Sequence, residues 1–214
     1  MASADSTTAI KVLDAICDRI EREKDHLCEL DAALGDGDHG ISMAKSFRAV
    51  KAKLGGMEGK ELSDVLSVAG MTLVSEVGGA MGPLFGTAFM RAGKAVVGKV
   101  ELTSADLARM LAAAEEGIVQ RGKAQPGDKT MLDAVHPAAQ AAQRAAAEGA
   151  DLQQVLLAAA SAASQGVEDT KGMVARVGRA SRLGERTIGH QDAGATSVSI
   201  ILQQAADSLA SLSE

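Results

Sequence analysis

The chain has 214 residues, enough for one domain with a substantial core, and a formal net charge of −6 at pH 7. This acidic balance argues against a nucleic-acid-binding surface, which needs clustered lysines and arginines. No apolar run reaches the roughly 18 residues of a membrane span, and the N-terminal segment lacks the pattern of a signal peptide. Cys17 and Cys28 are too few for a disulfide framework. We therefore expect a cytoplasmic protein with reduced cysteines that binds neither nucleic acid nor a membrane.

The composition favours an all-α fold. Hydrophobic residues make up 46% of the chain, but there are three Phe and no Trp or Tyr. The core must therefore consist of Ala, Leu, Val, Ile and Met side chains, a set that favours close helix–helix packing over a sheet sandwich. The sequence contains neither an alternating strand pattern of useful length nor a convincing internal repeat.

The spacing of the apolar residues predicts eight helices. In chain order we expect a helix that ends at Asp31, a second from Asp38 to Gly55, a third over 60–77, a fourth from Pro83 to Gly98, a fifth from Thr103 to Arg121, a sixth that opens at Gly127 and Asp128 and is kinked at Pro137, a seventh carrying 152–163 and an eighth carrying 198–209.

One segment, from about Val174 to Gly194, has no helical spacing. It holds several glycines and four arginines, and a loop of this length in a compact bundle is usually functional or disordered. The eighth helix begins where the segment ends. The backbone N–H groups of Gly194, Ala195 and Thr196 could therefore bind an anion.

The stretch LGDGDHG, with Asp31 just before it, crowds three carboxylates into eight residues. Gly35 and Gly37 let the chain turn, so Asp31, Asp36 and Asp38 can point into one space. A hard divalent cation with oxygen ligands would offset their repulsion. An EF-hand is a poor match, because its later ligand positions are missing. Solvated loop carboxylates are the alternative interpretation.

Other loops are candidates for phosphate binding, because Mg²⁺ usually shares protein carboxylates with substrate phosphates. The glycine-rich turn 78–82 precedes the fourth helix and could present N–H groups to a phosphate, although close helix packing explains it equally well. The turn Gly127–Thr130 is not a P-loop and is explained as a plain turn and helix cap. Four arginines of the long loop could neutralise charge during phosphoryl transfer or simply be solvated: Arg176, Arg179, Arg182 and Arg186.

The four histidines have different expected roles. His39, beside Asp38, could hydrogen-bond a phosphate or face water, and His190 could order its own loop. His26 and His136 are expected to be structural.

Four separated motifs resemble one known family. LGDGDHG, SEVGGAMGPLFGTAF, RGKAQPGDKTMLD and GRASRLGERTIGHQDAGATS occur in the order and at the distances found in the nucleotide-binding L-subunit domain of dihydroxyacetone kinases, and span residues 31 to 197. The resemblance implies an antiparallel barrel of eight amphipathic helices, with the nucleotide site in loops at one end. It also implies that residues 1–214 form a single domain of this type.

The resemblance also implies which residues form the site. Two Mg²⁺ ions would be held by Asp31, Asp36 and Asp38, and Arg179 would contact the phosphate as the catalytic residue. Ser42 stands where a longer Asn is frequent, and Ala193 where a proline is frequent. The ADP or ATP site would be lined by His39, Gly40, Ile41, Ser42, Ala80, Met81, Gly122, Met131, Arg179, Asp192, Ala193 and Gly194.

By the same resemblance, we expect the chain to be the nucleotide subunit of a dihydroxyacetone-type kinase. A separate K subunit would hold the dihydroxyacetone, and a phosphoryl-carrier protein of the sugar phosphotransferase system would recharge tightly bound ADP. Alternatives are an ATP-exchanging subunit for another short ketose or tetrose, the nucleotide domain of a fatty-acid kinase, and a non-catalytic adaptor to a transcription regulator. A homodimer is a further expectation.

Overall fold

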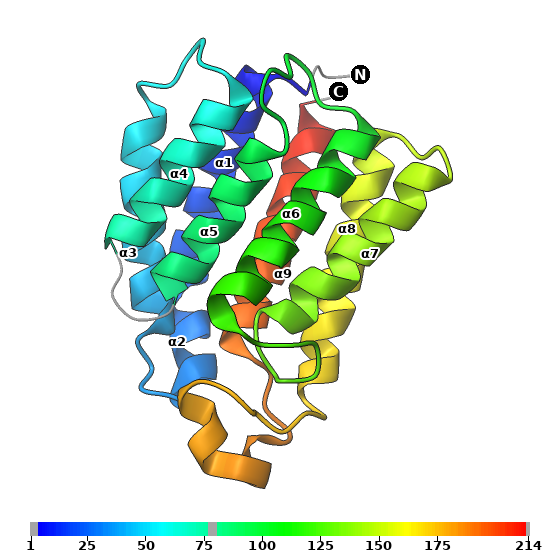
Figure 1. Ribbon diagram of the computed structural model, residues 1–214. Helices are drawn as coiled ribbons and strands as arrows, with labels where there is room; N and C mark the ends of the chain where they lie inside the picture. Colours follow the sequence, from blue (N-terminus) through cyan, green and yellow to red (C-terminus); the bar gives the residue numbers. More distant parts are fainter. Residues whose placement is uncertain (1–3, 77–80, 213–214) are drawn as a thin grey trace.

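The computed structural model describes residues 4–76 and 81–212, and these residues form nine α-helices and one 3₁₀ helix, with no strand among them. The predicted all-α fold is confirmed. None of the described helices is both long enough and apolar enough to cross a membrane. In chain order the elements in Figure 1 are α1 (Ser6–Arg22), α2 (Lys24–Ala32), α3 (His39–Leu54), α4 (Leu62–Glu76), α5 (Met81–Lys94), α6 (Ser104–Gly122), α7 (Leu132–Ala147), α8 (Leu152–Thr170), η1 (Arg179–Thr187) and α9 (Ala193–Ser211).

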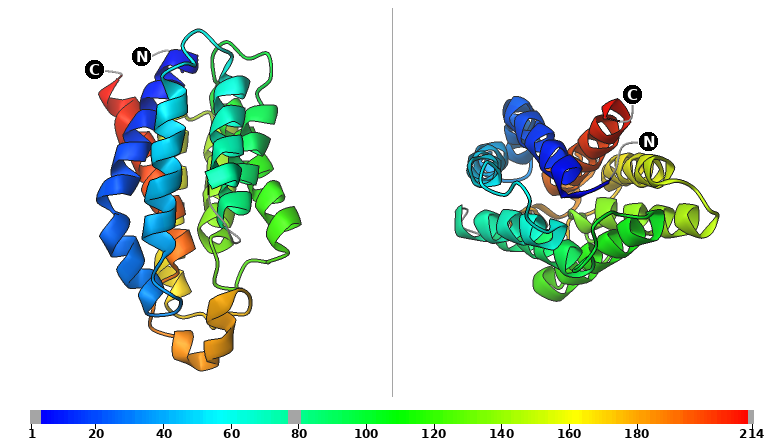
Figure 2. Two further views of the ribbon diagram at one scale, coloured as in Figure 1. Left: turned by 90° about the vertical axis from the view of Figure 1, so that its left-hand side faces the viewer. Right: turned by 90° about the horizontal axis from the view of Figure 1, so that it is seen from above.

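The eight longer helices form a closed antiparallel barrel. Each of α3 to α8 packs against the next α-helix along the chain, α3 also packs against α1, and the ring closes where α9 packs against α1. Figure 2, seen from above, shows these helices around a common axis. Both termini lie at one end of the barrel, and η1 lies at the opposite end (Figure 1).

Two predicted helix boundaries are corrected by the structure. The first predicted helix is in fact two, because the chain leaves the helical conformation at Glu23, which has φ −86° and ψ 2°. The sixth predicted helix begins at Leu132 rather than at Gly127, and it continues through Pro137. It starts late because the Asp133 carboxylate accepts hydrogen bonds from the backbone N–H groups of Gly127 and Thr130, which keeps these residues in a turn.

The core has the composition that the sequence predicts. The Ala, Leu, Val, Ile and Met side chains of the barrel interior form one continuous cluster. Phe47 is the largest fully buried side chain, and its ring meets that of Phe89 edge to face at a centroid distance of 6.2 Å.

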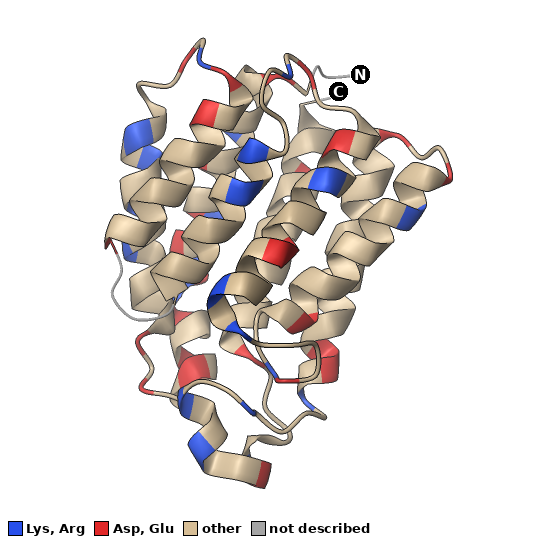
Figure 3. Ribbon diagram, viewed as in Figure 1, with Lys and Arg blue, Asp and Glu red and all other residues tan. Residues whose placement is uncertain are grey.

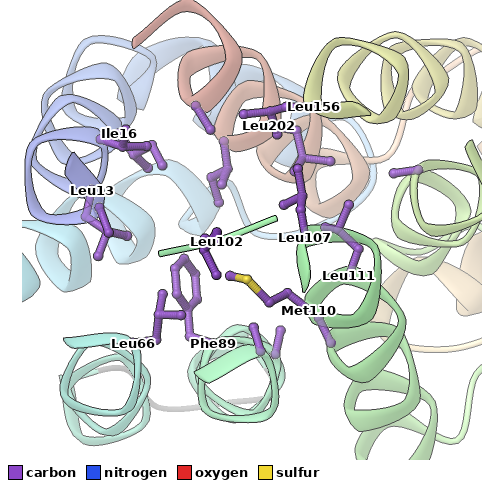
Figure 4. Close-up of a pocket in the computed structure, with 18 of the residues that line it drawn as sticks. Leu13, Ile16, Leu66, Phe89, Leu102, Leu107, Met110, Leu111, Leu156 and Leu202 are labelled. Atoms are coloured by element: carbon purple, nitrogen blue, oxygen red, sulfur yellow. The ribbon is translucent and has the colours of Figure 1, made fainter. Parts of the chain in front are cut away.

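An apolar pocket of about 230 Å³ lies inside the barrel. Figure 4 shows Leu13, Leu66, Phe89, Met110 and other side chains from several helices pointing into it. Its other labelled lining residues are Ile16, Leu102, Leu107, Leu111, Leu156 and Leu202.

Helices α4 and α5 come into close contact through a pair of glycines. A Cβ atom on Gly70 would lie 2.6 Å from the Gly86 carbonyl oxygen, and a Cβ atom on Gly86 would lie 2.5 Å from the Gly70 carbonyl oxygen. Because both neighbours are backbone atoms, they cannot move aside without separating the two helices.

We expect Gly86→Ala to lower the free energy of unfolding by about 1–3 kcal/mol, because the added methyl group forces α4 and α5 apart. Chemical denaturation followed by circular dichroism measures this change. Gly55→Ala is the matched control, since a Cβ atom there would meet nothing within 4 Å, and it should cause no loss. Equal stability of the Gly86→Ala and wild-type proteins would show that the α4–α5 contact does not require glycine.

Candidate functional site

A cavity of about 710 Å³ lies at the barrel end opposite the termini. The loop after α2, the start of α5, the end of α6, the turn before α7, the segment that enters η1 and the start of α9 contribute to it. Phe85, Ile118 and Met131 line this cavity and also the apolar pocket of the barrel interior. The site therefore rests directly on the hydrophobic core.

Three carboxylates meet at one side of this cavity. Asp31 belongs to the last turn of α2, and Asp36 and Asp38 follow in the loop to α3. One oxygen from each carboxylate lies within 4.8 Å of the other two. The turn depends on glycine, because Gly37 has a φ of +75° and a Cβ atom on Gly35 would collide with the Asp31 carboxylate. The predicted convergence of these acids is present in the structure.

The Asp31 carboxylate also fixes the start of α3. Its Oδ2 accepts hydrogen bonds from the backbone N–H groups of Asp38 at 3.1 Å and His39 at 3.4 Å. These are N–H groups at the helix start, which have no partner within the helix. One side chain thus joins the end of α2, the acidic loop and α3.

The acidic cluster is electrostatically strained and partly compensated by an arginine. Desolvation raises the pKa of Asp38, and the neighbouring carboxylates of Asp36 and Asp31 add to this shift, whereas Arg179 opposes it. Arg179, the first residue of η1, forms an ion pair with Asp36. Figure 3 shows acidic segments of α2 and the following loop beside basic segments of η1. An all-oxygen donor set with excess negative charge fits a hard divalent cation such as Mg²⁺.

The N-terminus of α9 faces the same cavity. Asp192 caps the helix, and its carboxylate accepts a hydrogen bond from the Ala195 N–H at 2.7 Å. Burial raises the pKa of Asp192 to about 6. At Gly194 a Cβ atom would lie 3.0 Å from the Asp192 carboxylate. Ala193 and Gly194 line the cavity, so the positive end of the helix dipole faces it, an arrangement that favours an anion there.

Comparisons with known proteins agree with this geometry. Residues 33–207 match the DAK2 domain. The chain is 42% identical to the ADP-binding subunit DhaL of the PEP-dependent dihydroxyacetone kinase of Escherichia coli (strain K12), over 95% of this chain and 97% of the relative. It is 36% identical to the ADP-binding subunit DhaL of the PTS-dependent dihydroxyacetone kinase of Lactococcus lactis, over 92% and 94%. The chain belongs to the DhaL family.

A solved structure has the same fold. The dihydroxyacetone kinase of C. freundii in complex with AMP-PNP and Mg²⁺ superposes with a TM-score of 0.70 and 25% identity. The alignment covers 97% of the DhaL-family chain and 35% of that kinase, so the chain spans about a third of its length. The barrel architecture expected from the motifs is therefore that of a known kinase.

Most of the residues predicted for the site in this DhaL-family chain do lie around the cavity. Arg179 is the one of the four loop arginines that is among the described lining residues. The predicted residues that line the cavity are Asp31, Asp36, Asp38, His39, Ser42, Met81, Gly122, Met131, Arg179, Asp192, Ala193 and Gly194.

Two predicted residues are placed differently, and a third is not described. Gly40 and Ile41 are not among the described lining residues. Gly40 packs against α2, where a Cβ atom would collide with the Lys24 carbonyl oxygen, and Ile41 is 58% exposed. Ala80, with the adjoining Gly78 and Gly79, lies outside the described residues.

Three of the four histidines are held by protein groups, whereas His26 is exposed on α2. His39 is buried, and its Nε2 lies 2.8 Å from Ser197 Oγ, so the alternative that it faces water is wrong. Its ring joins α3 to α9, and burial lowers its pKa to about 4. His190 does order its loop, through its backbone groups. His136 Nδ1 lies 2.5 Å from Glu115 Oε1, which joins α7 to α6.

The sequence does not predict the role of Lys129, whose Gly127–Thr130 segment is explained by its pattern as a plain turn. The residue has a φ of +61° and is 2% exposed. Its ammonium donates hydrogen bonds to the backbone carbonyl oxygens of Thr170, Thr187 and His190. Burial lowers its pKa, and the nearby Asp192 and Asp133 carboxylates oppose that shift. A lysine in a Gly-Asp-Lys-Thr turn normally points to solvent, so the local sequence carries no signal of its burial.

The buried His39 predicts a specific acid sensitivity. The unfolded chain takes up a proton near pH 6.5, whereas the folded state does so near pH 4, so protonation favours unfolding as the pH falls below 6.5. Between pH 7 and pH 5 we expect the wild type to lose about 2 kcal/mol more stability than His39→Gln. Denaturation with urea at both pH values measures this difference. Parallel losses in the two proteins would contradict a neutral, buried His39.

Proposed function

We propose that this chain is the nucleotide-binding subunit of a dihydroxyacetone-type kinase. It would hold a Mg²⁺-bound nucleotide and pass a phosphoryl group to dihydroxyacetone carried by a separate subunit. The observation that carries the proposal is the convergence of three carboxylates, one arginine and a helix N-terminus on one cavity, in a chain of the DhaL family. Residues 1–214 would act as one domain, in keeping with the closure of the ring between α1 and α9.

The nucleotide would bind with its phosphates between the acidic cluster and α9. Asp31, Asp36 and Asp38 would hold two Mg²⁺ ions, which neutralise phosphate oxygens when bound. The start of α9 at Ala193 and Gly194 would donate backbone N–H groups to the same phosphates. The cavity volume of about 710 Å³ falls within the range of small-molecule sites, and Gly122 and Met131 would border the nucleoside.

Phosphoryl transfer requires little of the protein beyond positioning and charge stabilisation. Arg179 would supply a positive charge to the transferred group, and its side chain is 63% exposed beside Asp36. The acceptor hydroxyl would belong to the dihydroxyacetone that the partner subunit holds. This chain therefore needs no general base of its own.

The names of the relatives support a proposal for the phosphoryl donor. The E. coli subunit belongs to a PEP-dependent kinase and the L. lactis subunit to a PTS-dependent one, and both are named ADP-binding. We therefore propose that ADP stays bound and is recharged by a phosphoryl-carrier protein. Free exchange of ATP is the alternative, and acceptance of another short ketose or tetrose is compatible with the same site.

One reconstitution tests this function. The purified chain is mixed with a dihydroxyacetone-binding K subunit, and phosphorylation of dihydroxyacetone is followed either with PEP and the phosphotransferase carriers or with ATP. Turnover with the carriers, together with ADP released from the denatured protein, supports the recharged-ADP route. Turnover with ATP alone supports free exchange. Absence of turnover with both donors favours an adaptor function.

We expect Asp36→Asn to weaken Mg²⁺-dependent ADP binding by at least ~10-fold, because it removes one charge from the metal cluster. Asp36 is a suitable target because its half-exposed side chain pairs with Arg179 at the surface. Isothermal titration with ADP in magnesium and in EDTA separates the metal-dependent part of the affinity.

The matched control is Asp25→Asn, an exposed carboxylate in the first turn of α2, at the other end of the helix that carries Asp31. It should bind ADP like the wild type. If Asp36→Asn binds ADP as tightly as this control in magnesium, the metal assignment is incorrect.

A further inference from the structure

We propose that Lys129 is a positioning residue of the nucleotide site. Its ammonium holds the chain between Thr170 and Asp192 in the conformation that brings Arg179 and the start of α9 to the same cavity. The inference rests on the proposed function, because the segment is taken to bind the nucleotide phosphates.

The ammonium has no hydrogen left for a phosphate. A lysine has three N–H donors, and those of Lys129 go to the carbonyl oxygens of Thr170 at 2.6 Å, Thr187 at 2.8 Å and His190 at 2.5 Å. Although Lys129 borders the cavity, all three of its hydrogen bonds therefore go to the backbone. Its effect on a ligand must pass through the segment that it holds.

One connection leads from Lys129 to α9. Thr170 is the last residue of α8, and its carbonyl oxygen accepts a hydrogen bond from the Lys129 ammonium. Its Oγ1 accepts a second hydrogen bond, from the Asp192 N–H, at 3.0 Å. Asp192 in turn caps α9 through the Ala195 N–H. The helix start that faces the cavity is thus three hydrogen bonds away from Lys129.

A second connection leads to Arg179. The carbonyl oxygen of Thr187, the last residue of η1, accepts a hydrogen bond from the Lys129 ammonium. Thr187 Oγ1 donates to the Gly184 carbonyl oxygen at 2.7 Å and accepts from the Ala175 N–H at 3.0 Å, which closes the loop at its base. Arg179, at the opposite end of η1, pairs with Asp36 of the acidic cluster.

The turn that carries Lys129 is itself rigidly held. The Asp128 carboxylate accepts from the Gln125 N–H at 2.8 Å, and Asp133 accepts from Gly127 and Thr130. The Asp128 carbonyl oxygen accepts from the Arg176 N–H at 3.1 Å. The backbone of Lys129 is therefore held in place, and its ammonium hydrogen-bonds the carbonyl oxygens of Thr170, Thr187 and His190.

The arrangement needs a cation specifically. Three carbonyl oxygens that converge on one buried point repel one another, and they would lose their hydrogen bonds if the ammonium were removed. Since the barrel helices pack on their own hydrophobic cluster, we expect this loss to loosen the 170–192 segment before it affects the barrel.

The first test compares two lysine variants of the full chain. Lys129→Met should bind ADP in magnesium roughly tenfold more weakly or worse, with an unchanged helical circular dichroism spectrum. The control is Lys171→Met, which removes a partly exposed ammonium paired with Glu168 at the end of α8. This control should stay within about twofold of the wild type.

The second test separates positioning from a general structural role. In Lys129→Ala, n-propylammonium supplies the missing methylenes and charge, whereas 1-propanol supplies a similar shape without the charge. We expect n-propylammonium to restore ADP affinity saturably, and 1-propanol to leave it low. Without nucleotide, amide hydrogen exchange over 170–192 should be faster in Lys129→Ala than in the wild type and should slow again with n-propylammonium.

The outcomes are distinct. A wild-type protein that fails to bind ADP in magnesium would reject the proposed function, and this inference with it. If the wild type binds ADP, then unchanged affinity in Lys129→Met, or failure of n-propylammonium to restore either affinity or exchange protection in Lys129→Ala, would overturn the positioning role alone.

Discussion

The buried ammonium of Lys129 is the interaction on which the arrangement of the candidate site depends. The loop from Thr170 to Asp192 has no hydrophobic spacing of its own, and much of its surface is exposed. What fixes it is the convergence of three backbone carbonyl oxygens on one positive charge. Because this loop carries Arg179 and ends at Asp192, the cap of α9, a single side chain positions both Arg179 and the start of α9 at the cavity.

The second feature of the cavity is the cluster of negative charge formed by Asp31, Asp36 and Asp38. Asp31 satisfies the start of α3 while it remains part of the acidic cluster, so the same carboxylate serves the fold and the site. Arg179 balances part of this charge through its direct ion pair with Asp36. The site thus consists of a compact anionic half next to a helix start and an arginine, a charge distribution suited to a magnesium-bound phosphate.

The sequence was sufficient for the helices of the barrel and for most of the residues that line the cavity, but not for local features set by distant contacts. Apolar spacing located the eight long helices, because each buries one face in the common core. It could not locate the break at Glu23 or the late start of α7, which depends on Asp133 bonding back to the turn. The motifs grouped Gly40 and Ile41 with the cavity, yet helix geometry turns them toward α2 and solvent.

The all-α class, the composition of the core and the convergence of the three acids can be read from the amino-acid sequence, because helix periodicity and the glycines of LGDGDHG are local properties. The roles of His39 and Lys129 depend instead on contacts between distant parts of the chain. His39 meets Ser197 of α9, and Lys129 meets carbonyl oxygens more than 40 residues away. Such partners are selected by the closure of the barrel, which brings distant loops to one end, and no local pattern encodes that closure.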